Sequence, residues 1–232
     1  MIRAILFDFN GVLLDDEPLH MELLQELLAE ADIELTEADY WATYVGFDDR
    51  EAFRRAYEAV NRELSEVALI QLIARKAVLY QERIEARGFP FFPGAVDFIA
   101  ACAESGLRRG VVSGALRSEI VVALERSGAS RYFGPIVSAD DVSASKPDPE
   151  GYVKGIQELN QQKPLPERLL HAHEILAIED TDAGLEAARA AGLRTIGVEH
   201  TFGADRLSAA EVVVPKISDL EVGQLAELLG GR

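Results

Sequence analysis

The sequence is poor in cysteine and in positive charge, and it has no long hydrophobic run. Its one cysteine, Cys102, cannot form a disulfide within the chain, and the apolar stretch around it predicts a buried thiol. Lysine and arginine number 23 against 40 aspartates and glutamates, so the net charge of -17 excludes a generic basic surface for nucleic acid. No segment reaches the length of a membrane span, and Asp8 interrupts the first apolar run too early for a signal peptide. We therefore expect a cytoplasmic protein that binds neither nucleic acid nor membrane.

The composition is that of a globular protein, with 48% hydrophobic and 27% charged residues. Short apolar runs recur, each followed by a polar or glycine-containing turn; they read IRAILF, RRGVV, PIVS, EILAI, RTIGV and EVVV. Helical patterns separate most of them, over residues 94–105, 119–127, 149–159 and 183–191. This alternation predicts an α/β fold in which a doubly wound parallel sheet is covered by helices.

Residues 18–87 differ from the rest, because they show helical periodicity and no convincing strand. One predicted helix carries an apolar face formed by Leu19, Leu23, Leu24, Leu27, Leu28 and Ala31. A second helical pattern runs over residues 65–87. We expect a helical cap domain over residues 16–88, inserted into a core domain formed by residues 1–15 and 89–232.

Polar residues follow four of the predicted elements of the core. They are Asp8, Ser113 with Gly114, Lys146, and Glu179 with Asp180. In an open parallel sheet, ligands bind beyond the carboxyl ends of the strands, so these side chains are candidates for one site. A carboxylate such as Asp8 can attack phosphorus and form an acyl phosphate. The carboxylates also suit Mg²⁺, which prefers oxygen ligands.

The remaining residues of this set suit phosphoryl binding. Ser113 can donate to a phosphoryl oxygen, Gly114 lets the main chain approach it, and Lys146 supplies a fixed positive charge. Each residue also has a simpler explanation, since Ser113 can cap a helix and Lys146 can lie in a solvated turn. Asp8 and the Glu179-Asp180 pair can likewise act as helix caps. Four such clusters in one order favour a shared phosphoryl-transfer site.

Four segments, in this order, resemble the motifs of the haloacid dehalogenase superfamily. The resemblance is to the branch that contains β-phosphoglucomutase and small-molecule phosphatases with a helical cap. The segments are DFNGVLLDDEPLH, VVSG, SKPDPEGY and IEDTDAGLEAARAAG. The resemblance implies that Asp8 is the nucleophile and that Ser113 and Lys146 hold the phosphoryl group. It implies that Glu179 and Asp180 hold Mg²⁺.

The predicted cap carries three further residues that resemble that branch. His20 closes the first motif, Arg50 ends a segment that resembles the substrate-reading cap loop, and Lys76 falls near a cap lysine of the mutases. The alternative for Arg50 and Lys76 is ordinary surface charge, because both lie on helical patterns. The alternative for His20 is packing at the hinge.

Asn10 departs from the family pattern, which usually has an aspartate two residues after the nucleophile. That aspartate protonates the leaving oxygen and later activates water, whereas an amide cannot carry a proton. General acid-base catalysis is typically worth about 10² to 10⁴-fold in rate. The family's metal ligand at this position is the backbone carbonyl, which Asn10 keeps. We therefore expect binding of Mg²⁺ and phosphate to survive, with turnover reduced.

The sequence thus predicts a Mg²⁺-dependent phosphatase of a small phosphorylated metabolite such as a sugar phosphate, acting as a monomer or weak homodimer. One alternative is an enzyme whose leaving group needs little protonation. Another is a slow sugar-phosphate phosphatase or a β-phosphoglucomutase-like phosphomutase, or a sequence in which aspartate was changed to asparagine to trap a complex. A third is a non-catalytic protein that binds phosphate and metal. A dehalogenase is disfavoured, because that branch works without Mg²⁺.

Overall fold

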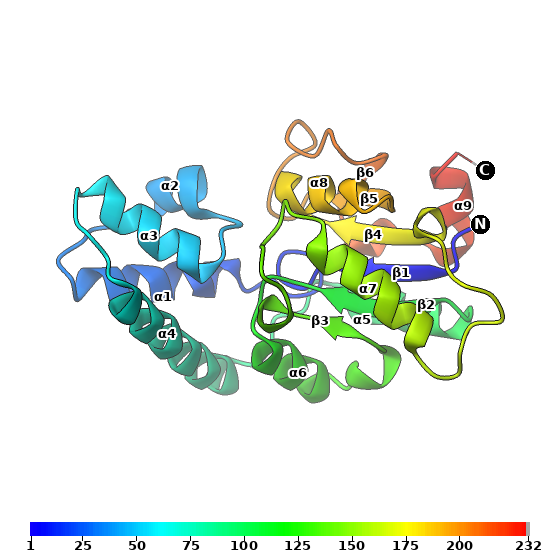
Figure 1. Ribbon diagram of the computed structural model, residues 1–232, viewed down its shortest axis with the longest axis horizontal. Helices are drawn as coiled ribbons and strands as arrows, with labels where there is room; N and C mark the ends of the chain where they lie inside the picture. The colour runs from blue at the N-terminus through cyan, green and yellow to red at the C-terminus, as the bar shows by residue number, and fades with distance from the viewer. Residues whose placement is uncertain (231–232) are drawn as a thin grey trace. The chain divides into compact units, whose positions relative to one another are not determined.

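A computed structural model describes residues 1–230, which form two compact units (Figure 1). The core unit consists of Met1–Asp15 together with the chain from Pro90 onward, and the cap unit consists of Asp16–Phe89. The cap unit is therefore inserted between two segments of the core unit.

The core unit is built on a parallel sheet. Within residues 1–230 the sheet has six strands in the order β3-β2-β1-β4-β5-β6, and every neighbouring pair is parallel. The strands are β1 (Ala4–Phe7), β2 (Arg108–Val112), β3 (Ile136–Val137), β4 (Ile175–Glu179), β5 (Arg194–Val198) and β6 (Val212–Val214). The predicted doubly wound α/β fold is confirmed.

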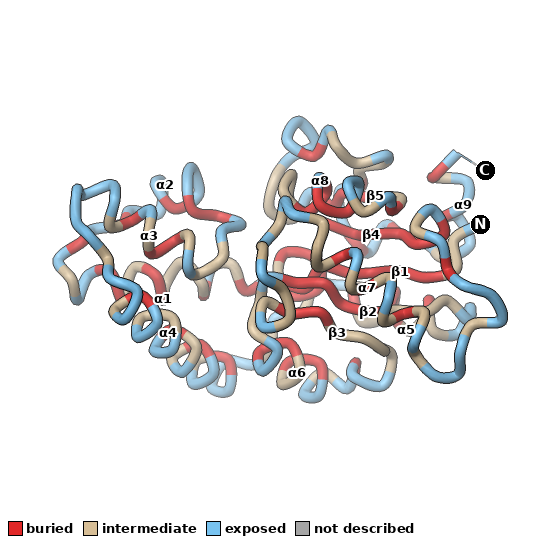
Figure 2. Tube along the Cα trace, viewed as in Figure 1, coloured by how far each residue is buried: buried red, intermediate tan, exposed pale blue. Residues whose placement is uncertain are grey.

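Both faces of the sheet are covered, which is why its central strands are continuous apolar runs. The helices of the core unit are α5 (Ala95–Glu104), α6 (Arg117–Arg126), α7 (Glu150–Gln161), α8 (Asp182–Ala190) and α9 (Leu225–Leu228). Figure 1 shows α7 and α8 on one face of the sheet and α5 on the other. Leu6 packs in the cluster on the α7 side, whereas the ring of Phe7 meets Phe98 of α5 edge-on at 6.2 Å. The tube in Figure 2 is buried along β1 and β4 and over the last three residues of β2.

The 3-10 turns of the core unit lie in the connections between these elements. They are η2 (Ser130–Tyr132), η3 (Ala139–Asp141), η4 (Ala172–Glu174), η5 (Ile217–Asp219) and η6 (Val222–Gln224).

The cap unit is helical throughout. Its elements are α1 (Glu17–Ala29), α2 (Glu37–Asp39), the π-helical turn η1 (Tyr40–Tyr44), α3 (Asp49–Ala59) and α4 (Glu66–Arg87). The apolar face of α1 packs on α4, where Leu19 and Leu23 form one cluster with Tyr80 and Ile84. Helix α1 ends before Ala31, so the predicted apolar face extends beyond the helix.

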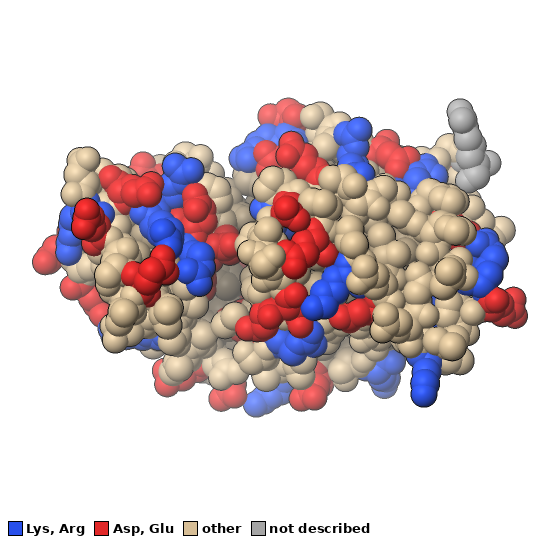
Figure 3. All heavy atoms as spheres, viewed as in Figure 1, with Lys and Arg blue, Asp and Glu red and all other residues tan. Residues whose placement is uncertain are grey.

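Figure 3 shows acidic and basic side chains interspersed on the face it presents. In the part of the chain that the structure describes, no helix combines the length and the apolar character that crossing a bilayer requires.

Candidate active site

The predicted site residues of the core unit lie at the carboxyl edge of the sheet. Asp8 directly follows β1, in which Phe7 is paired with Val111 of β2 and Ile178 of β4. The N–H of Asp8 donates to the carbonyl of Ile178 at 3.0 Å, which continues the ladder beyond the strand. This register places Asp8 beside the ends of both neighbouring strands, where Ser113 follows β2 and Glu179 is the last residue of β4.

Lys146 connects the predicted nucleophile with an acid of β4. Its Nζ lies 2.8 Å from Oδ1 of Asp8 and 2.7 Å from Oε1 of Glu179. Burial by itself would lower the pKa of Lys146, but the two carboxylates outweigh burial and hold this pKa above its ordinary value. The lysine is therefore a permanent positive charge at the end of the sheet.

Asp8, Glu179 and Asp180 form a buried cluster of carboxylates. Each offers an oxygen that lies within 4.8 Å of the others, and all three side chains are buried. Burial raises the pKa of both Glu179 and Asp180, and the charge of Asp8 raises both further. Oε2 of Glu179 and Oδ1 of Asp180 have no hydrogen-bond partner among the described residues. A divalent cation fits this cluster, because it supplies the charge that one lysine cannot and accepts hard oxygen ligands.

Two hydroxyl groups that the sequence analysis missed donate to these acids. Tyr152 of α7 donates to Oε1 of Glu179, and Thr201 donates to Oδ2 of Asp180. Thr201 lies three residues after the end of β5, and a polar residue in that position is a sequence signal for the site. Tyr152 lies within the SKPDPEGY segment, but nothing in that segment indicates that its side chain turns inward.

Two glycines allow the main chain to approach the acids. Gly11 has φ +74°, and a Cβ on it would lie 1.9 Å from Oδ2 of Asp180. A Cβ on Gly184, in the first turn of α8, would lie 2.0 Å from Oε2 of Glu179. Any side chain at either position would therefore displace a carboxylate of the cluster.

The remaining predicted residues of the core unit lie in the loops after β1 and β2. Asn10 is half-buried in the loop after Asp8 and forms a bridge with Leu14. Oγ of Ser113 accepts the N–H of Ala115 at 3.2 Å, so the hydroxyl hydrogen can be donated elsewhere. The space around Gly114 is open, with no atom within 4 Å of a Cβ placed there.

His20 and Lys76 meet inside the cap unit in a buried polar cluster. Nζ of Lys76 lies 2.9 Å from Nδ1 of His20 and forms an ion pair with Asp49. The other ring nitrogen of His20 lies 3.2 Å from Oδ2 of Asp16, which also accepts the hydroxyl of Tyr80 at 2.5 Å. Because an ammonium group only donates, Nδ1 of His20 accepts and Nε2–H donates to Asp16.

Arg50 does not join this cluster. Its guanidinium lies on α3, is 54% exposed, and pairs with Glu66 at 3.3 Å. Lys76, by contrast, is only 4% exposed. Arg50 is therefore an exposed residue with an ion-pair partner, whereas Lys76 is buried.

The sequence and the fold have clear counterparts among known proteins. The sequence profile of the haloacid dehalogenase-like hydrolases matches residues 5–198. The chain therefore belongs to this family, which confirms the resemblance seen in its four motifs.

Individual relatives resemble the chain over nearly its whole length. It is 28% identical to protein CbbY of Rhodobacter capsulatus, over 98% of this chain and 99% of that protein. It is 26% identical to a phosphorylated carbohydrates phosphatase of Thermotoga maritima, over 94% of this chain and 96% of the relative. The crystal structure of β-phosphoglucomutase from Clostridium difficile shares the fold, with a TM-score of 0.85, 22% identity, and coverage of 99% of this chain and 97% of that one.

Proposed function

We propose that the protein is a Mg²⁺-dependent phosphatase of a small phosphorylated metabolite, in particular a sugar phosphate, that acts through an aspartyl phosphate on Asp8. The observation that carries this proposal is the position of Lys146, which lies within 3 Å of both Asp8 and Glu179. A nucleophilic carboxylate beside a fixed cation and further acids is the arrangement that phosphoryl transfer requires. The similarity to a phosphatase of phosphorylated carbohydrates supports the choice of substrate class.

The metal ion would be held by the buried acids. Asp8, Glu179 and Asp180 provide carboxylate oxygens, and Asn10 provides its backbone carbonyl. The buried oxygens of Glu179 and Asp180 without a partner among residues 1–230 support a cation at this place. When bound, Mg²⁺ neutralises the charge of the phosphoryl oxygens.

The chain's own residues then carry the reaction. A carboxylate oxygen of Asp8 attacks phosphorus, the bond from phosphorus to the leaving oxygen breaks, and an acyl phosphate forms. Lys146 and the hydroxyl of Ser113 stabilise the phosphoryl oxygens during both steps. Water then hydrolyses the acyl phosphate and regenerates Asp8. Asn10 can hold a hydrogen bond to the leaving oxygen but cannot give it a proton, so good leaving groups react fastest.

Phosphate release with Mg²⁺ tests this proposal, using sugar phosphates, acetyl phosphate and p-nitrophenyl phosphate. We expect release by the native chain, loss of release on chelation of Mg²⁺, and loss in an Asp8→Asn variant. Asp15→Asn is the matched control, because Asp15 is exposed and outside the cluster. Equal release by the Asp8→Asn variant and the native chain would contradict the proposal. Binding of Mg²⁺ and phosphate without any release would favour the non-catalytic alternative.

A phosphomutase is the second candidate, and the burial of Lys76 in the cap unit favours it. A mutase must hold a second phosphate, and a buried cation is suited to that purpose. The variants Lys76→Met and Arg50→Ala should then weaken binding of a sugar bisphosphate far more than binding of a monophosphate. Lys154→Met serves as the control, because Lys154 lies in α7 of the core unit, where it donates to the carbonyl of Asp141 at 3.0 Å. Equal losses for the two ligands would count against a mutase.

A further inference from the structure

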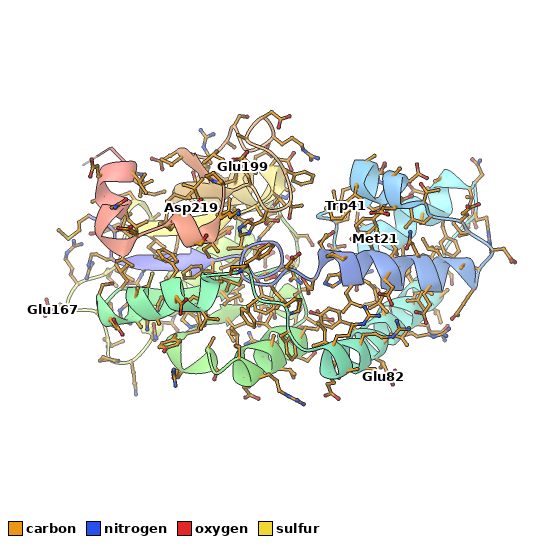
Figure 4. All side chains as sticks on the ribbon, turned by 180° about the vertical axis from the view of Figure 1, so that it is seen from behind. Met21, Trp41, Glu82, Glu167, Glu199 and Asp219 are labelled. Atoms are coloured by element: carbon orange, nitrogen blue, oxygen red, sulfur yellow. The ribbon has the colours of Figure 1, made fainter. Side chains whose placement is uncertain are left out.

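The segment that follows β5 contacts two separate parts of the proposed metal site. The first three residues after the strand are Glu199, His200 and Thr201. The carboxylate of Glu199 accepts the N–H of Ala204 at 2.8 Å, which closes the turn. Figure 4 labels Glu199 at this turn and Asp219 in η5, the neighbouring segment on the same side of the core unit. His200 and Thr201 have no role in the function proposed above.

The ring of His200 holds the loop that follows Asp8. Its Nδ1 lies 2.9 Å from the carbonyl oxygen of Gly11, and the N–H of Ile217 lies 3.3 Å from its Nε2. Because an amide N–H only donates, Nε2 accepts and Nδ1–H donates to Gly11. The ring also stacks on Phe92, with 3.8 Å between ring centroids. Both ring nitrogens and one ring face are therefore engaged, which fixes the orientation of His200.

The hydroxyl of Thr201 holds Asp180. It donates to Oδ2, whereas Oδ1 is buried and has no hydrogen-bond partner among the described residues. Oδ2 is also the atom that a Cβ on Gly11 would meet at 1.9 Å. Asp180 thus packs directly against the backbone that His200 holds. His200 therefore holds the backbone at Gly11, and Thr201 holds the carboxylate of Asp180 that packs against it.

We propose that His200 and Thr201 are positioning residues for the metal site. Thr201 occupies one oxygen of Asp180 and leaves the other for the cation. His200 holds the carbonyl of Gly11, and with it the adjoining backbone of Asn10, which is another proposed ligand. The inference rests on the proposed Mg²⁺ site, to which neither side chain contributes a ligand. Partners that orient metal ligands typically account for about 10 to 100-fold in metal affinity.

The test is the Mg²⁺ dissociation constant of the full chain, measured by titration calorimetry without substrate. Thr201→Val removes the hydroxyl at constant shape and should weaken Mg²⁺ binding by about tenfold or more. Thr201→Ser keeps the donor and should restore most of the affinity. Thr195→Val is the matched control, because Thr195 is buried in β5 and its hydroxyl accepts the N–H of Glu211 at 3.2 Å, away from the acids. This control should bind Mg²⁺ like the native chain.

A second variant tests His200 in the same way. His200→Phe keeps a ring against Phe92 but removes both hydrogen bonds, and it should also weaken Mg²⁺ binding. His173→Phe is its control, because His173 lies in η4 before β4 begins, at the opposite edge of the sheet. Melting temperatures without Mg²⁺ show whether each variant is folded.

The outcomes separate this inference from the proposed function. Native affinity in both Thr201→Val and His200→Phe would overturn the positioning role while leaving the metal site intact. An equal loss in Thr195→Val and Thr201→Val would also overturn it, because the loss would then follow general destabilisation. If the native chain binds no Mg²⁺, both the metal site and the inference are overturned. Both are also overturned if an Asp180→Asn variant binds Mg²⁺ as tightly as the native chain.

Discussion

The hydroxyl of Tyr152 donates to Oε1 of Glu179, the same oxygen that lies 2.7 Å from the ammonium of Lys146. Tyr152 and Glu179 are both fully buried, so no water replaces this bond if it is lost. Oε1 of Glu179 thus accepts from two donors, the hydroxyl of Tyr152 in α7 and the ammonium of Lys146 in the loop before α7. Tyr152 links helix α7 to the acid cluster.

A Tyr152→Phe variant should lose stability while keeping its fold. A hydrogen bond to a charged group typically contributes about 1.5–3 kcal/mol, and the phenylalanine ring fills the same space. We expect the free energy of unfolding in urea, without Mg²⁺, to fall by about this amount. Tyr132→Phe is the control, because the hydroxyl of Tyr132 meets only the exposed Arg131 among the hydrogen bonds of the described residues. Equal changes in the two variants would show that the bond to Glu179 contributes little.

An Asn10→Asp variant should gain turnover selectively. The new carboxyl group can protonate the leaving oxygen, which is typically worth about 10² to 10⁴-fold. The gain should be large for sugar phosphates, whose leaving alcohols are strong bases, and small for acetyl phosphate. The measurement is kcat for each substrate in the native chain and in the variant. The same gain for every substrate would argue against a role in proton transfer.

A Gly184→Ala variant should be less stable and should bind Mg²⁺ more weakly. The added Cβ would lie 2.0 Å from Oε2 of Glu179, and Lys146 and Tyr152 prevent that carboxylate from moving freely. Helix propensity by itself favours alanine over glycine by about 0.8–1 kcal/mol, so a loss of stability would indicate the steric conflict. Gly223→Ala is the control, because the space around Gly223 is open. Melting curves with and without Mg²⁺ check both effects. A Gly184→Ala variant as stable as its control would contradict the crowding.

Glu174 should stabilise the core unit in a pH-dependent way. Hydrogen bonds from Arg168, followed by the N–H of His171, lower the pKa of Glu174 to about 2. A carboxyl group with a lowered pKa in the folded state stabilises the protein above its unfolded pKa, and this contribution is lost as the pH falls through the folded value. Glu174→Gln should therefore lower the melting temperature at pH 7 and at pH 5. The difference in melting temperature between the native chain and the variant should narrow as the pH falls from about 4 to about 2. A difference that stays constant over this range would exclude the ion pairs as its cause.

The strands were predicted most closely, because each coincides with a short run of mainly apolar residues. RRGVV and RTIGV coincide with β2 and β5. The cap unit was predicted less completely. Helix α3 is rich in charge and buries only Ala52, Phe53 and Ala56, so its apolar face is small. No sequence signal that we recognise marks the π-helical turn η1.

Some features of the site follow from local sequence patterns, whereas others depend on contacts between segments far apart in the chain. Asp8 and Glu179 were grouped from the sequence because parallel strands bring their carboxyl ends to one edge. The contact between Tyr152 and Glu179 depends instead on how closely α7 packs on the sheet. Gly155 permits that approach, since a Cβ there would lie 2.9 Å from Leu6. The close approach of two segments that are far apart in the chain produces no pattern in the local sequence.

The central position of β1 has a cost during synthesis. Ala4 pairs with Arg108 on one side and with Ile175 on the other, so both partners of the strand are made long after it. The whole cap unit is translated in the interval, and its helices can fold from local contacts. Until β2 and β4 emerge, four residues that end up fully buried remain without a partner strand. During that interval β1 is an unpaired apolar strand, and an unpaired apolar strand is prone to aggregate with other chains.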